Sequence, residues 1–145
     1  MLRNLRTHKI LWLVAALLAL IAAVAGVVQP AIYDRVAGAE VLPGILSQDW
    51  ATIVAALVLL ILALRAGEAS TRSQIVCLGI LGYFFYAYGV YAIERIYTVL
   101  YLLYLAIFGL ASYAIGYGVA SIRAEARQGV TLGRGMRWLS VSFSL

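Results

Sequence analysis

This chain of 145 residues is poor in the residue types that carry most enzyme chemistry. It has one cysteine and one histidine, and only 12% of its residues are charged, against about a quarter in an ordinary soluble domain. Cys77 has no second cysteine with which to form an intramolecular disulfide or a CxxC pair, which argues against a disulfide-exchange enzyme. His8 alone cannot supply a bis-histidine haem or a histidine-rich metal site. The sequence also has no GxSxG, HExxH or P-loop pattern, so we expect no catalytic residue, no metal and no cofactor.

Apolar residues dominate instead, at 65% of the chain, and the mean hydropathy is +0.98. They form four long runs, for which we expect membrane-spanning helices over about 10–28, 50–66, 75–93 and 97–122. The first run is longer than the apolar region of a typical signal peptide, so we interpret it as a retained helix. An external loop over 29–49 and a cytoplasmic tail over 123–145 complete a single transmembrane domain, 1–145. The predicted fold is all-α, an integral membrane four-helix antiparallel bundle with a tight hairpin at Glu94 and Arg95.

Charge is distributed unevenly around the four runs. Nine of the eleven basic residues precede the first run, separate the second from the third, or follow the fourth: Arg3, Arg6, Lys9, Arg65, Arg72, Arg123, Arg127, Arg134 and Arg137. The other two gaps hold the remaining basic residues and four of the six acids: Arg35, Arg95, Asp34, Glu40, Asp49 and Glu94. The positive-inside rule then predicts both termini in the cytoplasm, with the chain in the cell membrane. Because the basic residues flank apolar helices and no nucleic-acid motif is present, the expected partner is the lipid bilayer and not a nucleic acid.

Asp49 occupies an unusual position at the start of the second run. Its carboxylate is a suitable N-cap for a helix from Trp50 to Leu64, but such a helix is shorter than the hydrocarbon core of a bilayer. Either the helix continues past Arg65, or the Ser47–Asp49 turn lies below the outer membrane surface. The second alternative requires a protein-lined or wet environment for the polar groups.

Tyrosine is concentrated near the predicted hairpin, with nine of the ten tyrosines between 83 and 117. Two stripes at helical spacing follow from their positions: Phe84, Tyr88, Tyr91 and Arg95 on the third helix, and Tyr97, Tyr101, Tyr104 and Phe108 on the fourth. If the stripes face each other, they form either ordinary aromatic packing or the wall of an externally open pocket. Asp49 and Arg95 are expected to pair at its mouth. The candidate ligand-binding residues are therefore Asp49, Tyr88, Tyr91, Glu94, Arg95, Tyr97, Tyr101 and Tyr104.

Two further expectations concern the inside of the bundle. Ser112, Gly116 and Ala120 share one face of the fourth helix, and such small-residue faces favour close helix packing. His8 lies beside the first basic cluster, outside the predicted span. The membrane interior of the first two helices lacks ionisable groups, so we expect no proton relay through the bundle.

The segment Leu78–Tyr117 (LGILGYFFYAYGVYAIERIYTVLYLLYLAIFGLASYAIGY) resembles a family of uncharacterised prokaryotic polytopic membrane proteins whose third and fourth helices are rich in tyrosine. Ser47-Gln48-Asp49 is similar to the Gly-Gln-Asp turn that precedes helix 2 in that family, with serine in place of the usual glycine. The resemblance implies a shared architecture, a shared site near Asp49 and, in other members, two further helices. It implies no activity.

The most direct functional hypothesis is a non-catalytic membrane protein. It would bind a hydrophobic ligand, a lipid or a partner subunit through an outer-facing cleft rich in tyrosine. One alternative is a subunit of a small transporter or channel, which needs a homo-oligomer or a partner membrane subunit to form a path. A second alternative is an interfacial membrane enzyme that uses Asp49, Glu94 and Arg95.

Overall fold

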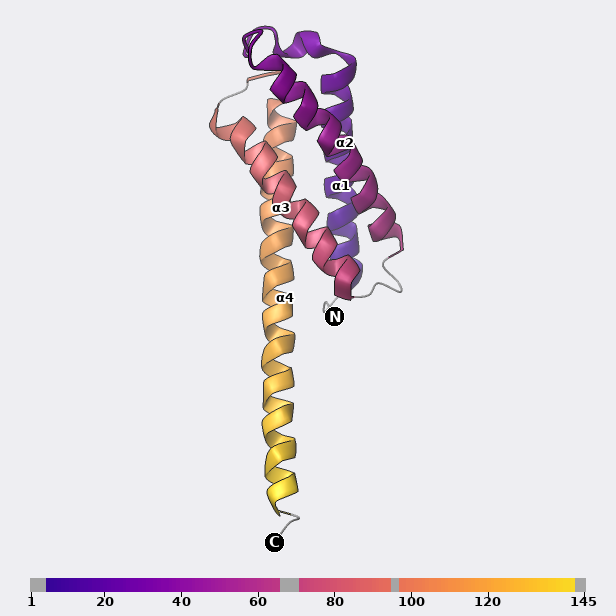
Figure 1. The fold of residues 1–145 in the computed structure, drawn as a ribbon, viewed down its shortest axis with the longest axis vertical. Helices are drawn as coiled ribbons and strands as arrows, with labels where there is room; N and C mark the ends of the chain where they lie inside the picture. Colours follow the sequence, from indigo (N-terminus) through magenta and orange to yellow (C-terminus); the bar gives the residue numbers. More distant parts are fainter. Residues whose placement is uncertain (1–4, 66–70, 95–96, 143–145) are drawn as a thin grey trace.

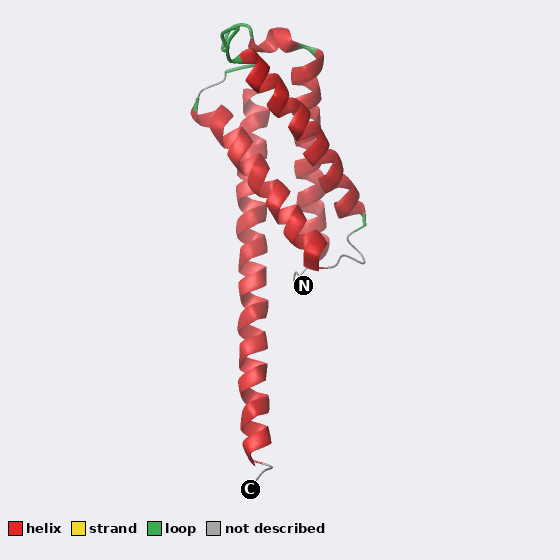
Figure 2. Cartoon of the chain, viewed as in Figure 1, coloured by secondary structure: helices red, strands yellow, loops and turns green. Residues whose placement is uncertain are grey.

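The computed structural model describes residues 5–65, 71–94 and 97–142, and within them the side chains of all but residues 5, 71, 125 and 128–142. Four α-helices and one 3-10 helix follow in the order α1 (Leu5–Val28), η1 (Pro30–Tyr33), α2 (Leu42–Leu64), α3 (Thr71–Ile93) and α4 (Tyr101–Ser142). The described part of the chain contains no strand (Figure 2). The all-α prediction is therefore confirmed.

All four α-helices are long and apolar enough to cross a membrane. The candidate spans are Arg6–Val28, Leu42–Leu64, Arg72–Ile93 and Tyr101–Ala124. A span of 22 to 24 residues rises about 33 to 36 Å at 1.5 Å per residue, which exceeds the roughly 30 Å hydrocarbon core of a bilayer. All four helices are therefore long enough to span a membrane. The second helix is not as short as the sequence suggested.

Successive helices run in alternating directions, and α1 begins and α4 ends towards the same end of the molecule (Figure 1). The largest interfaces join α1 to α2 and α3 to α4, and α1 also packs against α4. We call the end of the bundle that carries η1 and the α3–α4 connection the η1 end. From there α4 runs the length of the bundle and, being 42 residues long, continues well beyond it to Ser142 (Figure 1). The segment predicted as a tail is thus helical over its described part.

The second helix begins eight residues earlier than predicted, at Leu42 in place of Trp50. The loop predicted over 29–49 includes Pro43 and Gly44, but Pro43 lies in the first turn of α2, where its missing amide and fixed φ are tolerated. The prediction that Asp49 caps this helix is therefore wrong, because Asp49 lies inside α2. Asp49 instead lies in the protein-lined environment that the second alternative requires.

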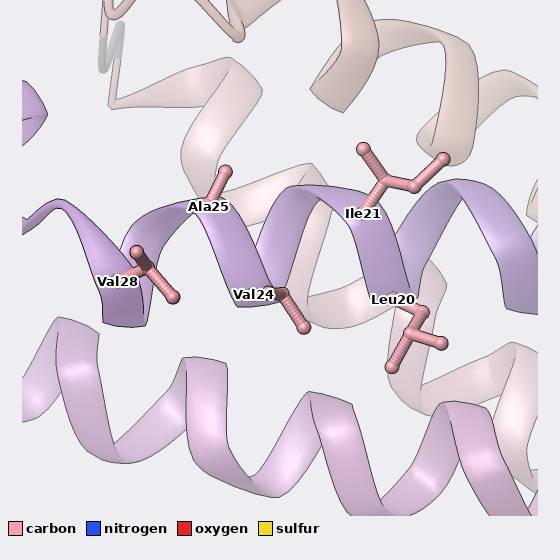
Figure 3. A pocket seen from close by; sticks show the side chains of 5 residues that line it. All are labelled: Leu20, Ile21, Val24, Ala25 and Val28. Carbon is pink, nitrogen blue, oxygen red and sulfur yellow. The ribbon is translucent and has the colours of Figure 1, made fainter.

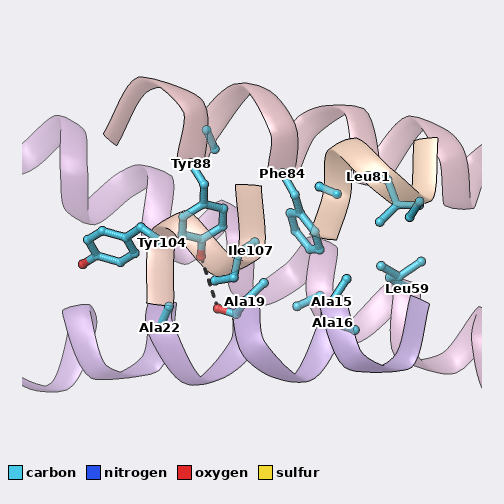
Figure 4. Packing of buried hydrophobic residues seen from close by; sticks show 14 of the residues in the cluster. Ala15, Ala16, Ala19, Ala22, Leu59, Leu81, Phe84, Tyr88, Tyr104 and Ile107 are labelled. Carbon is cyan, nitrogen blue, oxygen red and sulfur yellow. Dashed lines mark hydrogen bonds between the residues drawn. The ribbon is translucent and has the colours of Figure 1, made fainter. Parts of the chain in front are cut away.

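The core is built from a small-residue face on α1 and large side chains from α3 and α4. Ala15, Ala16, Ala19 and Ala22 are all buried on this face. Their small side chains leave room for larger ones from the opposing helices. Figure 4 shows Phe84, Tyr88 and Ile107 directed towards these alanines. The Tyr88 hydroxyl also donates a hydrogen bond to the Ala19 carbonyl oxygen, at 3.3 Å.

The small-residue face expected on the fourth helix does not provide such a packing surface. Gly116 and Ala120 are exposed, and a Cβ built on Gly116 meets nothing within 4 Å. The spacing of small residues on α4 was no guide to packing, because small residues are common in apolar helices and only the opposing surface decides which of them are needed.

A substitution on the α1 face tests this packing. We expect Ala19→Leu to destabilise the protein by about 1–3 kcal/mol, because the added atoms must displace the ring of Tyr88 from a filled core. The matched substitution Ala106→Leu, at an exposed position of α4, should change stability little. Unfolding of both variants in detergent, followed by circular dichroism, measures the difference, and equal stability of the two would contradict the packing described here.

Candidate functional site

Asp49 is the buried acid of the described chain. Only 2% of its surface is exposed, whereas Asp34, Glu40 and Glu94 are all exposed. An ionised carboxylate in such a place loses its hydration, and the loss has to be offset by hydrogen-bond donors or opposite charge. The surroundings of Asp49 are therefore the first place to look for a site.

Two phenols donate to the Asp49 carboxylate. The Tyr33 hydroxyl, from η1, lies 2.7 Å from Asp49 Oδ2, and the Tyr91 hydroxyl, from α3, lies 3.4 Å from Oδ1. The first distance is that of a strong hydrogen bond, while the second is long. Each carboxylate oxygen thus has a donor, and each donor comes from a different element.

Tyr104 of α4 extends this network, since its hydroxyl lies 3.3 Å from the Tyr33 hydroxyl. Tyr33 has one proton and donates it to Asp49, so in this arrangement Tyr104 is the donor to Tyr33. Tyr33 keeps that proton because burial, and after it the nearby Asp49 charge, raise the pKa of the Tyr33 phenol well above its usual range.

Aromatic packing encloses the same point. The ring of Tyr88 lies 5.8 Å from that of Tyr91 and 5.7 Å from that of Tyr104, and the rings of Tyr91 and Tyr104 are 5.1 Å apart. All three side chains are almost fully buried. We call Tyr33, Asp49, Tyr88, Tyr91 and Tyr104 the Asp49 cluster.

The remaining helix, α1, contributes Gly26. A Cβ at this position would collide with the Asp49 carboxylate and with the Tyr33 hydroxyl. Position 26 therefore requires glycine, because α1 lies too close to the carboxylate for a side chain to fit. With Gly26 included, all four α-helices and η1 meet at the Asp49 cluster.

A pocket of about 350 Å³ lies beside the cluster, at the η1 end. One wall is formed by η1 and by Arg35, two residues after its end, and the other by the segment that leads into α4. Its lining residues are Ala31, Ile32, Arg35, Tyr97, Thr98 and Val99. We call it the outer pocket. It combines a guanidinium group, two hydroxyls and apolar side chains.

Both walls of the outer pocket are tied to the cluster. Tyr33 belongs to the same 3-10 turn as Ala31 and Ile32, and it turns inward to Asp49. Thr98 lies within side-chain hydrogen-bonding reach of Tyr104 and also accepts a bond of 3.2 Å from the Leu100 amide. The geometry of the pocket therefore depends on contacts made by the cluster.

The predicted site residues thus separate into three groups. Asp49, Tyr88, Tyr91 and Tyr104 come together, but as a packed interior and not as the wall of an open cleft. Tyr97 is exposed in the outer pocket and packs on Tyr101, whose hydroxyl donates to the Ala92 carbonyl oxygen.

Of the two remaining predicted residues, only Glu94 is described, and it makes no described contact with the cluster. Glu94 is exposed just after the end of α3. Arg95 lies outside the described residues, so its pairing with Asp49 stays a prediction.

Tyr33, Gly26, Arg35 and Thr98 were missed as site residues. For Tyr33 a signal was present: it is the single tyrosine outside 83–117, and it follows Pro30 by three residues in the loop nearest Asp49 in sequence. No sequence pattern distinguished Gly26 from the other twelve glycines, because its role depends on a contact between helices.

The sequence-based placement of His8 is also corrected. His8 lies within the candidate span Arg6–Val28 and is fully buried, with Nε2 3.3 Å from the Ser121 hydroxyl and its ring 4.6 Å from that of Tyr117. Together with Asp49 it shows that α1 and α2 do carry buried ionisable groups. Apolar side chains fill the core between these two positions: Leu59, Leu81, Phe84 and Ile107 (Figure 4).

Other features carry less chemistry. An apolar groove of about 460 Å³ runs along α1, lined by Leu20, Ile21, Val24, Ala25 and Val28 (Figure 3). It contains no polar side chain that could orient a ligand. Within residues 5–65, 71–94 and 97–142, no group of three or more His, Cys, Asp or Glu side chains is placed to hold a metal ion.

Comparisons with protein-family models, with curated proteins and with solved structures found no match to this chain. The family resemblance of the segment Leu78–Tyr117 therefore stays a prediction, and functional argument has to start from the Asp49 cluster and the outer pocket.

A single added methyl group tests the close approach at Gly26. Alanine is normally favoured over glycine inside a helix by about 1 kcal/mol, but here we expect Gly26→Ala to destabilise the protein by about 1–3 kcal/mol, because it displaces the Asp49 carboxylate or Tyr33. Gly79→Ala in α3 is the matched control, since a Cβ there meets nothing within 4 Å. Thermal unfolding in detergent should rank the variants as Gly79→Ala at or above the wild type and Gly26→Ala below it. The reverse order would show that the cluster has free space at α1.

Proposed function

We propose that this chain is a multi-pass protein of the prokaryotic plasma membrane with both termini in the cytoplasm. Four helices of sufficient length and apolarity support insertion, and an even number of spans returns the chain to the side where it began. The charge distribution supports the orientation, because nine of the eleven basic residues belong to the termini and the α2–α3 connection. In this orientation the η1 end, with the outer pocket, faces the outside.

Cysteine labelling tests the orientation. In a Cys77→Ala background, Gly38→Cys should react with a membrane-impermeant maleimide added to intact cells, and Gln128→Cys should react only after the membrane is opened. Gly38 is exposed in the connection between η1 and α2, and position 128 lies on α4 beyond the last candidate span. Labelling of both positions from outside would refute the orientation, as would labelling of Gln128→Cys alone.

We further propose that the protein is not an enzyme and binds a small amphipathic ligand in the outer pocket. The observation that carries this proposal is the lining of the pocket. Arg35, Tyr97 and Thr98 offer hydrogen-bond donors on a concave surface to which Ile32 and Val99 add apolar side chains. A cavity that combines apolar side chains with a few polar groups is the usual form of a small-molecule site.

The Asp49 cluster has a supporting role in this proposal. The sequence favoured a cleft lined by tyrosines, whereas Tyr88, Tyr91 and Tyr104 are packed against one another and almost fully buried. They are better suited to hold the two pocket walls than to contact a ligand directly. Tyr33 fixes the η1 wall through Asp49, and Tyr104 connects that wall to the segment containing Thr98.

The two alternatives have less support. A transporter or channel subunit needs a polar path, and between the Asp49 cluster and His8 the core is filled by large apolar side chains such as Phe84 and Leu81. An interfacial enzyme built on Asp49, Glu94 and Arg95 needs carboxyl groups that reach a substrate, whereas Asp49 is buried and its described hydrogen bonds come from phenols.

Filling the pocket tests the binding proposal. Val99 lines the outer pocket and is 88% exposed, so a larger side chain there should obstruct the pocket without disturbing the core. We expect native mass spectrometry of the wild type, released from mild detergent, to show a retained amphiphile. Val99→Trp should reduce its occupancy by about tenfold, which corresponds to roughly 1.4 kcal/mol of binding free energy.

Val54→Trp is the control for this experiment, because Val54 is 61% exposed on α2 and does not line the outer pocket. It should retain the amphiphile as the wild type does. Equal retention by Val99→Trp and the wild type would mean that the amphiphile is bound elsewhere, and the proposal would fail.

A further inference from the structure

The hydroxyl groups between the outer pocket and Asp49 form a chain in which each member has one proton to donate. With Asp49 ionised, Tyr33 must donate to the carboxylate and Tyr104 must donate to Tyr33. Thr98, next in the chain, then directs its own proton inward to Tyr104. In this state the Thr98 hydroxyl has no proton for a ligand in the pocket.

Protonation of Asp49 reverses the chain. A proton taken from water onto Asp49 Oδ2 makes this oxygen a donor to Tyr33. Tyr33 then turns its proton to Tyr104, and Tyr104 turns its proton to Thr98, while Tyr91 continues to donate to Oδ1. The net covalent change is the transfer of one proton from hydronium in the surrounding water to Asp49, which breaks one O–H bond and forms another. The Thr98 proton is released from the chain and is free to point into the pocket.

We propose that the outer pocket binds an amphiphile with an anionic oxyanion headgroup, and that binding is coupled to the uptake of one proton by Asp49. This inference rests on the ligand-binding function proposed above and specifies its ligand class. Two physical effects favour the coupling: an anion in the pocket gains a donor when Thr98 turns outward, and a neutral Asp49 removes the repulsion between two negative charges across a poorly hydrated region. By linkage, the proton and the ligand must strengthen each other's binding by the same factor.

The headgroup charge follows from the pocket lining. Arg35 is a permanent cation whose planar guanidinium matches a phosphate or carboxylate group, and Tyr97 and Thr98 add hydroxyl donors. Ile32 and Val99 form the apolar part, which suits the first carbons of an acyl chain or another apolar tail. No carboxylate lines the pocket to favour a cation in its place.

Among the described residues, the titratable groups that face Asp49 are all phenols. They are Tyr33 from η1, Tyr88 and Tyr91 from α3, and Tyr104 from α4, while α1 contributes only Gly26. His8, the other buried ionisable side chain of α1 and α2, belongs to the other end of α1, 18 residues and about 27 Å from Gly26. A change in ligand affinity between roughly pH 8 and pH 5 therefore has two candidate sources in the described chain, Asp49 and His8, and variants separate them.

The test uses the whole chain in phosphatidylcholine nanodiscs, with pyrene-labelled phosphatidylglycerol as the anionic probe and pyrene-labelled phosphatidylcholine as the zwitterionic one. Energy transfer from the protein's tryptophans to pyrene reports binding. The phosphodiester of the probe stays ionised throughout the pH range. We expect the affinity for phosphatidylglycerol to rise about tenfold from pH 8 to pH 5.5, within the roughly 5–150-fold range of coupled sites, with no such rise for phosphatidylcholine.

Variants assign the effect. Asp49→Asn, which is neutral at every pH, should abolish the pH dependence while phosphatidylglycerol still binds, and Tyr104→Phe should weaken the dependence by interrupting the hydroxyl chain. His8→Gln should leave it unchanged. Competition with inorganic sulfate distinguishes the source of the headgroup: displacement of the probe indicates a free oxyanion as the ligand, and no displacement indicates a lipid.

Three outcomes would overturn the inference. The first is phosphatidylglycerol binding by the wild type that does not vary with pH, a result that holds even if Asp49→Asn fails to fold. The second is pH dependence that survives in Asp49→Asn or disappears in His8→Gln. The third is equal affinity for both probes at every pH. Failure of Val99→Trp to reduce retention of any amphiphile would instead refute the underlying binding function, so the two failures are distinguishable.

Discussion

A carboxylate buried among apolar helices has to find hydrogen-bond donors, and most of the architecture at the η1 end follows from how Asp49 does so. Its donors come from η1 and α3, a second phenol from α4 supports the first, and α1 approaches closely because Gly26 has no side chain. Removing one of the donor phenols leaves a buried oxygen with fewer hydrogen-bond partners, and a buried polar group left unsatisfied costs about 1–3 kcal/mol. The hydrogen bonds and close contacts of Asp49 thus fix the relative positions of α1, η1, α2, α3 and α4.

The number and type of the helices could be predicted from the sequence because they depend on local composition. Long apolar runs are visible residue by residue, and the pairing of Tyr88 and Tyr91 on one face follows from helical spacing. The start of α2 was missed because Pro43 was assigned to the loop over 29–49, although proline is favoured in a first turn. Tyr33 and Gly26 were missed for a different reason: their roles are contacts between segments 16 and 23 residues distant from Asp49, and no local pattern encodes such contacts.

The same constraint connects the core to the surface. Tyr33 lies in the 3-10 turn that forms one wall of the outer pocket, and Tyr104 lies beside the segment that forms the other. In the proposed coupling, a change at the carboxylate reaches the pocket by reorientation of hydroxyl groups, without any movement of a helix. The apolar core below the cluster, around Phe84 and Leu81, confines this polar chemistry to the η1 end. A binding protein with one polar end is consistent with both features.

The central claim, that Tyr33 and Asp49 act as one unit on which this end of the bundle depends, is tested most directly by a double-mutant cycle. Unfolding free energies in detergent would be measured for the wild type, Tyr33→Phe, Asp49→Asn and the double variant. We predict that each single change destabilises the protein and that the double variant falls short of their sum by about 1 kcal/mol or more, since the second change removes a group that the first has already left without its partner. Strictly additive effects would contradict the claim, because Tyr33 and Asp49 would then contribute to stability independently.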